Sequence, residues 1–165
     1  MVWGRELAWK VLIDRAQTKV NLAQRNALPV GTSLDCALCL GGEETGSHLF
    51  FGCSIAWRVW SKIYFWLGLR SVGAAEAKSH FLQHVALINP AKKFKKTLTL
   101  IWTAAISSIW WTRNNVLFNS GVVDVERIVD AIKYKVWLWL KVKEESFTFS
   151  FFEWLGNPLI CMQVL

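Results

Sequence analysis

The feature that most constrains this chain is a set of three cysteines and one histidine within eighteen residues. Cys36 and Cys39 flank two residues, and His48 and Cys53 follow in the pattern C-x2-C-x8-H-x4-C, with Gly41-Gly42 predicted to reverse the chain after the first pair. Three thiolates and an imidazole complete a tetrahedral shell for Zn²⁺ and leave no position for water. The pattern therefore predicts one structural zinc ion held by these four residues.

From the pattern alone, two arrangements without a metal stay open for the same cysteines. A C-x2-C pair also occurs as a redox couple or as two buried thiols. Redox pairs usually begin a helix in a β-α-β unit, which the sequence does not show, and the added histidine and third cysteine favour a metal. Cys161 lies far along the chain and is not assigned to the site. Cysteines clustered as metal ligands indicate a reducing, intracellular compartment.

The overall charge limits the classes of partner. The chain has 165 residues, of which 53% are hydrophobic and 11 are tryptophan, and its net charge is +7. A pI near 9.4 favours polyanionic partners such as nucleic acid, although a solvated basic surface explains it nearly as well. No phosphate-binding glycine loop, nucleophile elbow or carboxylate cluster is evident, so nothing indicates a small-molecule substrate or a catalytic residue.

Apolar spacing of three and four residues predicts a mostly α-helical chain. Thr18, Ser54 and Asp124 are expected to cap helices, and Pro90 to end one. After residue 143, alternating phenylalanines indicate a short strand or an extended strip. The apolar run 98–111 is too short to span a bilayer, which needs about 20 residues, so no membrane partner is expected. The predicted helices are 2–15, 19–26, 44–52, 55–68, 76–89, 93–118 and 125–143.

These helices are divided into two parts, a zinc-binding module over residues 1–68 and a Trp-rich helical extension over 69–165. Trp60, Trp102 and Trp139 are surrounded by apolar residues and are predicted to lie in the core. His80 and His84 share one helical face, but no further ligands are near. We therefore expect these two histidines to be packing or surface residues.

Clustered cations on the predicted helices are candidates for contact with nucleic-acid phosphates. The alternative is that each group simply solvates a helix face or a helix end. If exposed tryptophan or phenylalanine side chains lie nearby, they could stack on unpaired bases. The candidate phosphate-binding residues are Arg58, Lys62, Lys92, Lys93, Lys95 and Lys96.

Several blocks of the sequence, in order, are similar to a known family. They are LAWKVLIDR at 7–15, TKVNL at 18–22 with Arg25, the pair Cys36 and Cys39, Glu43-Glu44, HLFF-x-C at 48–53 and Val59-Trp60. Together they resemble the reverse-transcriptase zinc-binding domain that follows the polymerase in plant non-LTR (LINE-type) retroelements. IWWTRNNVLF at 109–118 resembles the W-x-x-R-N-x-x-x-F stretch that comes after this module. Many members have proline where this chain has Gln17.

The resemblance implies a zinc ligand set of Cys36, Cys39, His48 and Cys53, and an origin as the C-terminal fragment of a retroelement polyprotein. It also implies a nuclear location. It does not imply an enzyme, because the sequence has no Tyr-x-Asp-Asp motif and no RNase H carboxylates. The hypothesis is an accessory module that binds RNA or DNA non-specifically. The alternatives are a protein-interaction module that packs on the parent polymerase or on itself, and a fragment without activity.

Overall fold

The computed structural model describes residues 2–70, 73–87, 92–163 and 165, with the backbone alone at residues 2–3 and 92–93. The described residues are mostly helical and contain no β-strand, which confirms the predicted fold class. The helical elements are α1 (Val2–Leu12), α2 (Lys19–Ala23), the π-turn η1 (His48–Gly52), α3 (Ser54–Trp66), α4 (Ala77–Ala86), α5 (Lys92–Asn119), α6 (Val125–Lys143), α7 (Phe151–Gly156) and α8 (Pro158–Gln163).

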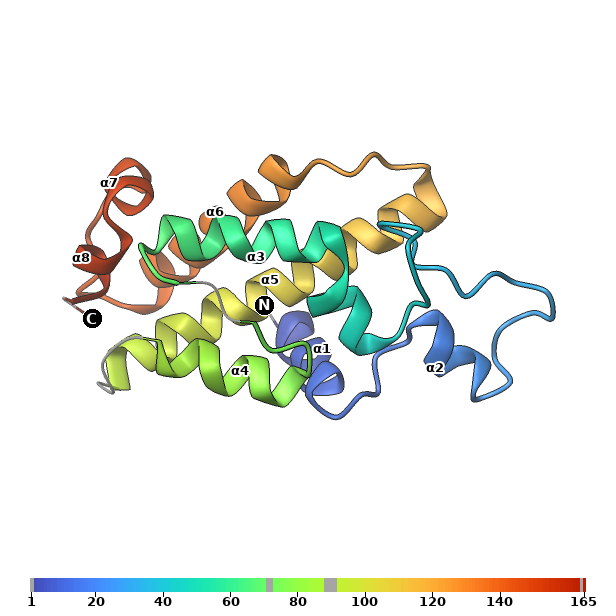
Figure 1. The fold of residues 1–165 in the computed structure, drawn as a ribbon. Coiled ribbons are helices and arrows are strands. Elements are labelled where there is room, and N and C mark those ends of the chain that lie inside the picture. The colour runs from blue at the N-terminus through green and yellow to red at the C-terminus, as the bar shows by residue number, and fades with distance from the viewer. Residues whose placement is uncertain (1, 71–72, 88–91, 164) are drawn as a thin grey trace.

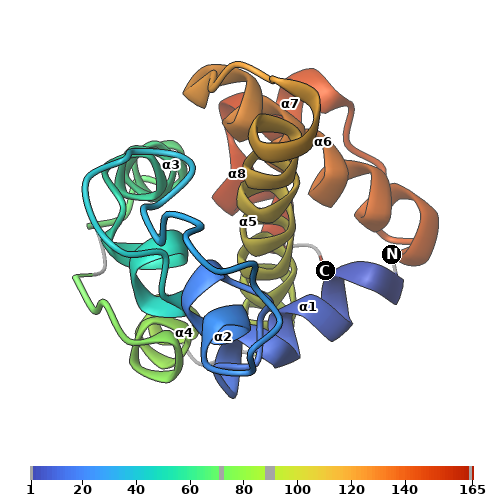
Figure 2. The same ribbon diagram turned by 90° about the vertical axis from the view of Figure 1, so that its right-hand side faces the viewer.

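The long helix α5 is the centre of the arrangement (Figures 1 and 2). Helices α1, α4 and α6 all pack directly against it, and α3 bridges between α5 and α6. Its apolar residues recur on more than one face, so that Leu98, Ile101, Trp102, Ile106 and Ile109 are all buried. A helix that is apolar on most sides is one that lies inside a bundle. Figure 2 shows α3 and α4 on one side of α5, with α6 and α7 on the other.

One hydrophobic core includes residues from both predicted parts of the chain. Leu49, Phe50 and Ile63 come from residues 1–68, whereas Ile132 and Trp154 come from the helical extension. The predicted boundary thus separates two lengths of chain that bury apolar surface against each other. The division into a zinc-binding module and a helical extension stays a prediction.

The helix starts follow the predicted caps in two of three cases. Thr18 Oγ1 accepts the Asn21 amide at 3.4 Å, and Asp124 Oδ1 accepts the Arg127 amide at 3.1 Å. The prediction for Ser54 was wrong, because α3 begins at Ser54 itself and the extended residue before it makes no side-chain cap. Helix α4 ends at Ala86, and Pro90 lies outside the described residues.

The C-terminal tail contains two helices that the apolar alternation did not predict. Residues 147–150 are extended without pairing in a sheet, and α7 and α8 follow. Ser150 and Glu153 form a capping box in which each side chain accepts the other residue's amide. The sequence did carry this signal, since Ser-x-x-Glu before an apolar run is a typical helix start.

Burial tests the core predictions for tryptophan and histidine. Trp60 and Trp102 are buried, as predicted, but Trp139 is only half-buried and lines a pocket. His80 and His84 are buried, which confirms the packing interpretation. Within the described residues, no helix combines the length and the apolar character needed to cross a bilayer.

Candidate metal centre

The four residues predicted to bind zinc converge on one point. The ligand atoms of Cys36, Cys39, His48 and Cys53 all lie within 4.8 Å of one another. The Cys36 and Cys53 sulfurs are 3.9 Å apart, and the Cys39 sulfur is 3.3 Å from His48 Nε2. Zinc–sulfur bonds of about 2.3 Å at tetrahedral angles separate two sulfurs by about 3.8 Å. The cluster therefore has the size and the ligand chemistry that one structural zinc ion requires.

The first cysteine pair is held by a tight loop whose ends pair with each other. Asp35 and Glu43 form an isolated antiparallel bridge, and the Cys36 amide donates to the Gly42 carbonyl at 2.7 Å. The chain reverses through Leu40, whose φ of 56° lies in the left-handed region. A left-handed conformation costs a non-glycine residue about 1–2 kcal/mol. The loop therefore stores strain at Leu40. The sequence had predicted instead that the glycines after it would reverse the chain.

The second pair is brought together by the π-turn η1. The Cys53 amide donates to the carbonyl of His48, five residues earlier, at 2.6 Å. A five-residue bond is wider than an α-helical turn, and such turns often occur at functional sites. It closes the turn with His48 at one end and Cys53 at the other, so that both side chains join the cluster. The short helix predicted over 44–52 is therefore shorter in the structure, where it is the π-turn His48–Gly52.

Glu44 connects the loop between Asp35 and Glu43, here called the metal loop, to the centre of the fold. This carboxylate is fully buried and accepts the Ala37 amide, inside the first cysteine pair, at 3.2 Å. It also accepts the amide of Lys19, the first residue of α2, at 3.1 Å. Arg113 of α5 donates to the same carboxylate from Nε at 3.0 Å and from Nη2 at 2.5 Å. The loop, α2 and α5 thus meet at one buried ion pair.

The Glu44–Arg113 pair is a structural connection that no local pattern in the sequence predicted. Both residues lie in blocks that carry the family resemblance, at Glu43-Glu44 and at Arg113-Asn114. Arg113 also stacks over the Trp110 ring, with its guanidinium carbon 4.8 Å from the ring centre. The pairing could have been suspected only by joining two blocks that are 69 residues apart.

The thiols of the cluster influence each other's ionisation. The hydrogen bond from Cys53 lowers the pKa of the Cys36 thiol, and the same bond together with burial raises the pKa of Cys53. The Gly41 amide donates a hydrogen bond to the Cys39 sulfur at 3.4 Å. Thiolates are the form that binds a metal. A divalent cation at the centre would displace the remaining thiol protons.

Among the candidate phosphate-binding cations, the four whose side chains the structure describes do not form one patch. Arg58 is exposed on α3, and Lys62, one turn later, pairs with Glu126 of α6 at 2.6 Å. Lys95 is exposed near the start of α5, whereas its neighbour Lys96 pairs with Glu144 and lies over the Trp139 ring. Helix α3 begins beside the metal loop, and α5 begins far from it, on the left of Figure 1. The side chains of Lys92 and Lys93 lie outside the described residues.

Comparison with known proteins agrees with this site. Residues 5–60 match a family model described as zinc-binding in reverse transcriptase. No curated protein matched the chain, and no solved structure matched it. The matched region includes the metal loop, η1 and the first turns of α3, but none of the helices from α4 onward. Residues 5–60, which carry all four members of the cluster, thus match the zinc-binding domain of reverse transcriptases, and the cluster fits one structural zinc ion.

Proposed function

We propose that this chain is a structural-zinc accessory module derived from a reverse transcriptase, and that it binds RNA or DNA without sequence specificity. The observation that carries the proposal is the match of residues 5–60 to the reverse-transcriptase zinc-binding model, because reverse transcriptases act on both nucleic acids. The net charge of +7 supports it, since non-specific binding is driven by contact between cations and phosphates. The match extends to the zinc-binding domain and to no catalytic domain, so we propose no catalytic activity.

In this proposal the zinc ion acts on the fold, and the cations contact the nucleic acid. Cys36, Cys39, His48 and Cys53 bind the ion, which fixes the loop and the start of α3. Arg58 lies four residues into that helix and is exposed, so a fixed helix start holds the backbone that carries its guanidinium. Lys62 and Lys96 are paired with carboxylates, and phosphates would have to compete with those partners.

The test is a titration of fluorescein-labelled single-stranded and duplex oligonucleotides, followed by anisotropy at several salt concentrations. We expect affinity to fall linearly with the logarithm of salt, with a slope that counts the phosphates contacted. Arg58→Ala should lower affinity similarly for all sequences and reduce the slope by about 1, whereas Arg58→Lys should retain most of the affinity. Binding that is undetectable, or that does not respond to salt, would contradict the proposal.

The family resemblance extends the proposal to the origin of the chain. The blocks at 7–15, 48–53 and 109–118 support derivation from the C-terminal part of a plant LINE-type retroelement polyprotein. The same resemblance supports action in the nucleus.

A second candidate function is favoured by the exposed aromatic surface. Trp57 and Phe65 of α3 are 60% and 87% exposed, and Trp111 and Phe118 of α5 are 65% and 75% exposed. Exposed apolar side chains at this density can mark a protein interface. Under this alternative, the parent polymerase or a second copy covers them. Light scattering that shows self-association would support it, and a monomer that binds no apolar dye would count against it.

A further inference from the structure

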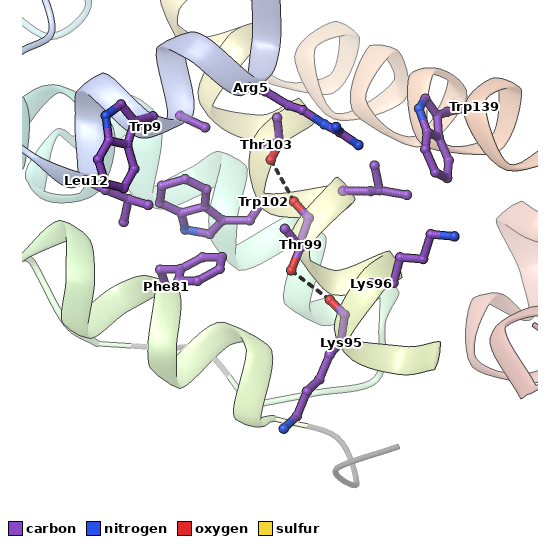
Figure 3. A pocket seen from close by; sticks show the side chains of 12 residues that line it. Arg5, Trp9, Leu12, Phe81, Lys95, Lys96, Thr99, Trp102, Thr103 and Trp139 are labelled. Atoms are coloured by element: carbon purple, nitrogen blue, oxygen red, sulfur yellow. Dashed lines mark hydrogen bonds between the residues drawn. The ribbon is translucent and has the colours of Figure 1, made fainter. Parts of the chain in front are cut away.

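A pocket of about 450 Å³ lies where α1, α4, α5 and α6 meet (Figure 3). Its volume falls within the range of about 300–1,000 Å³ that is usual for small-ligand sites. Aromatic and basic side chains dominate the lining, and no acidic residue is among the lining residues. The side chains that matter are Arg5, Trp9, Lys95, Lys96, Trp102 and Trp139.

The aromatic residues provide flat surfaces at the ends and the floor of the pocket. Trp9 of α1 is 62% exposed and Trp139 of α6 is half-buried, and Figure 3 shows them at opposite ends. Phe81 and the buried Trp102 pack edge to face between them, with ring centres 5.1 Å apart. Trp9 therefore presents an exposed ring that no core packing requires.

The positive charges of the pocket select for an anionic ligand. Arg5 and Lys95 are exposed, and Lys96 lies 5.5 Å above the Trp139 ring while it pairs with Glu144. The hydroxyls of Thr99 and Thr103 each donate to a carbonyl of α5 at 2.8 Å. These hydroxyls can only accept further hydrogen bonds, so the cations are the main donors that a ligand would meet.

We propose that this pocket holds an unpaired base of a single-stranded RNA or DNA, stacked on Trp9, with flanking phosphates at Arg5 and Lys95. The inference rests on the proposed function, and it deepens that function by naming a site. A flat apolar ring joined to an anionic group matches the lining, and every nucleotide offers this combination. Because bases in a duplex are already stacked on one another, the pocket favours single strands over duplexes.

The first test compares two tryptophans with similar exposed fractions. Trp9→Ala should weaken binding of a labelled single-stranded 12-mer by about five-fold or more, the lower end of the effect of removing a stacked aromatic. Trp111→Ala is the control, since Trp111 is 65% exposed but lies outside this pocket. An abasic oligonucleotide of the same length should bind both variants equally, because it keeps the phosphates and lacks the bases.

The second test compares two lysines with the same charge change. Lys95→Glu should weaken single-strand binding more than Lys143→Glu, which reverses an exposed charge at the end of α6 outside the pocket. A 12-mer carrying 5-iodouracil should form a photo-crosslink to the peptide that contains Trp9.

The outcomes separate this inference from the function on which it rests. If the wild-type chain binds oligonucleotides and Trp9→Ala binds them equally well, the pocket is not the site, although the proposed function stands. If the wild-type chain binds neither single strands nor duplexes, both proposals fail. If polyglutamate competes as well as the 12-mer does, or if the abasic oligonucleotide loses the same affinity in Trp9→Ala, base stacking is excluded and the inference is overturned.

Discussion

Two clusters, one partly buried and one buried, contain all three histidines of this chain, and they are stabilised in opposite ways. His48 lies among three cysteine sulfurs in the metal cluster. His80 and His84 lie in an aromatic cluster, where His80 is 4.5 Å from the Phe51 ring centre and 4.6 Å from that of Trp60. The first cluster gathers ligands that must lose protons and bind a cation. The second surrounds its rings with carbon and keeps them uncharged.

Hydrogen bonds define the protonation of the aromatic cluster. His84 Nε2 lies 2.9 Å from the Leu98 carbonyl, which can only accept, so this nitrogen carries the proton. His84 Nδ1 then accepts from the Tyr64 hydroxyl at 3.0 Å, and His80 Nδ1 accepts from the Trp102 indole at 3.2 Å. Burial lowers the pKa of His80 to about 3 and that of His84 to about 4. The same residue type is thus a candidate metal ligand in one setting and a neutral packing group in the other.

Of the changes that test this comparison, removal of the metal should have the largest effect on the structure. We expect one zinc per chain and loss of structure around the loop after chelation or in Cys36→Ser, because apparent binding energies of structural zinc are on the order of 10–16 kcal/mol. Metal analysis and circular dichroism before and after chelation measure this. Cys161→Ser is the control, since Cys161 is buried away from the cluster. A helical signal indifferent to both the chelator and Cys36→Ser would mean that the cysteines are only packed thiols.

Breaking the ion pair under the metal loop should have the next largest effect. Arg113→Met leaves Glu44 buried without its partner, and we expect it to lower the free energy of unfolding by about 3–5 kcal/mol. Urea denaturation measures the change. The double variant Glu44→Gln with Arg113→Met should recover part of the loss, because no charge is then left buried. A loss under 1 kcal/mol in the single variant would show that the loop does not depend on α5.

The aromatic cluster should make the protein less stable in acid. Both histidines bind a proton more readily when unfolded, with a pKa near 6.5, than when folded. Stability is therefore complete above about pH 6.5 and falls as the pH drops toward the folded values, by about 2 kcal/mol per histidine between pH 6.5 and 5. Urea denaturation of the wild-type chain and of the double variant His80→Phe/His84→Gln, both in excess zinc, isolates this contribution. Equal slopes in the two proteins would assign the pH dependence to other groups.

The smallest effect is expected at an exposed pair that joins two helices. Lys62 of α3 pairs with Glu126 of α6, and both side chains are largely exposed. We expect Lys62→Met to lower the free energy of unfolding by no more than about 1 kcal/mol, because water and salt screen such pairs. The measurement is the same urea titration used for Arg113→Met. If Lys62→Met lowers the free energy of unfolding as much as Arg113→Met does, the buried and the exposed ion pair contribute equally to the stability of this fold.

Local patterns were sufficient for most of the helices and for the metal ligands. Thr18 and Asp124 cap helices where their side chains predicted it, since a cap depends on the three residues that follow it. The set of four candidate ligands could also be predicted from local sequence, because its members lie within eighteen residues. Ligand spacing in small zinc sites is local. Ser54 failed as a cap because the π-turn bond from Cys53 to His48 moves the helix start by one residue.

The sequence by itself determined the metal chemistry, the helical class and the excess of positive charge. The tertiary structure alone decided that Glu44 meets Arg113 across 69 residues, that Trp60 packs against both His80 and His84, and that Trp9 shares a pocket with Lys95. The physical reason is distance along the chain. Ligand type, caps and periodicity act over a few residues, whereas burial and pairing depend on which helices α5 brings together.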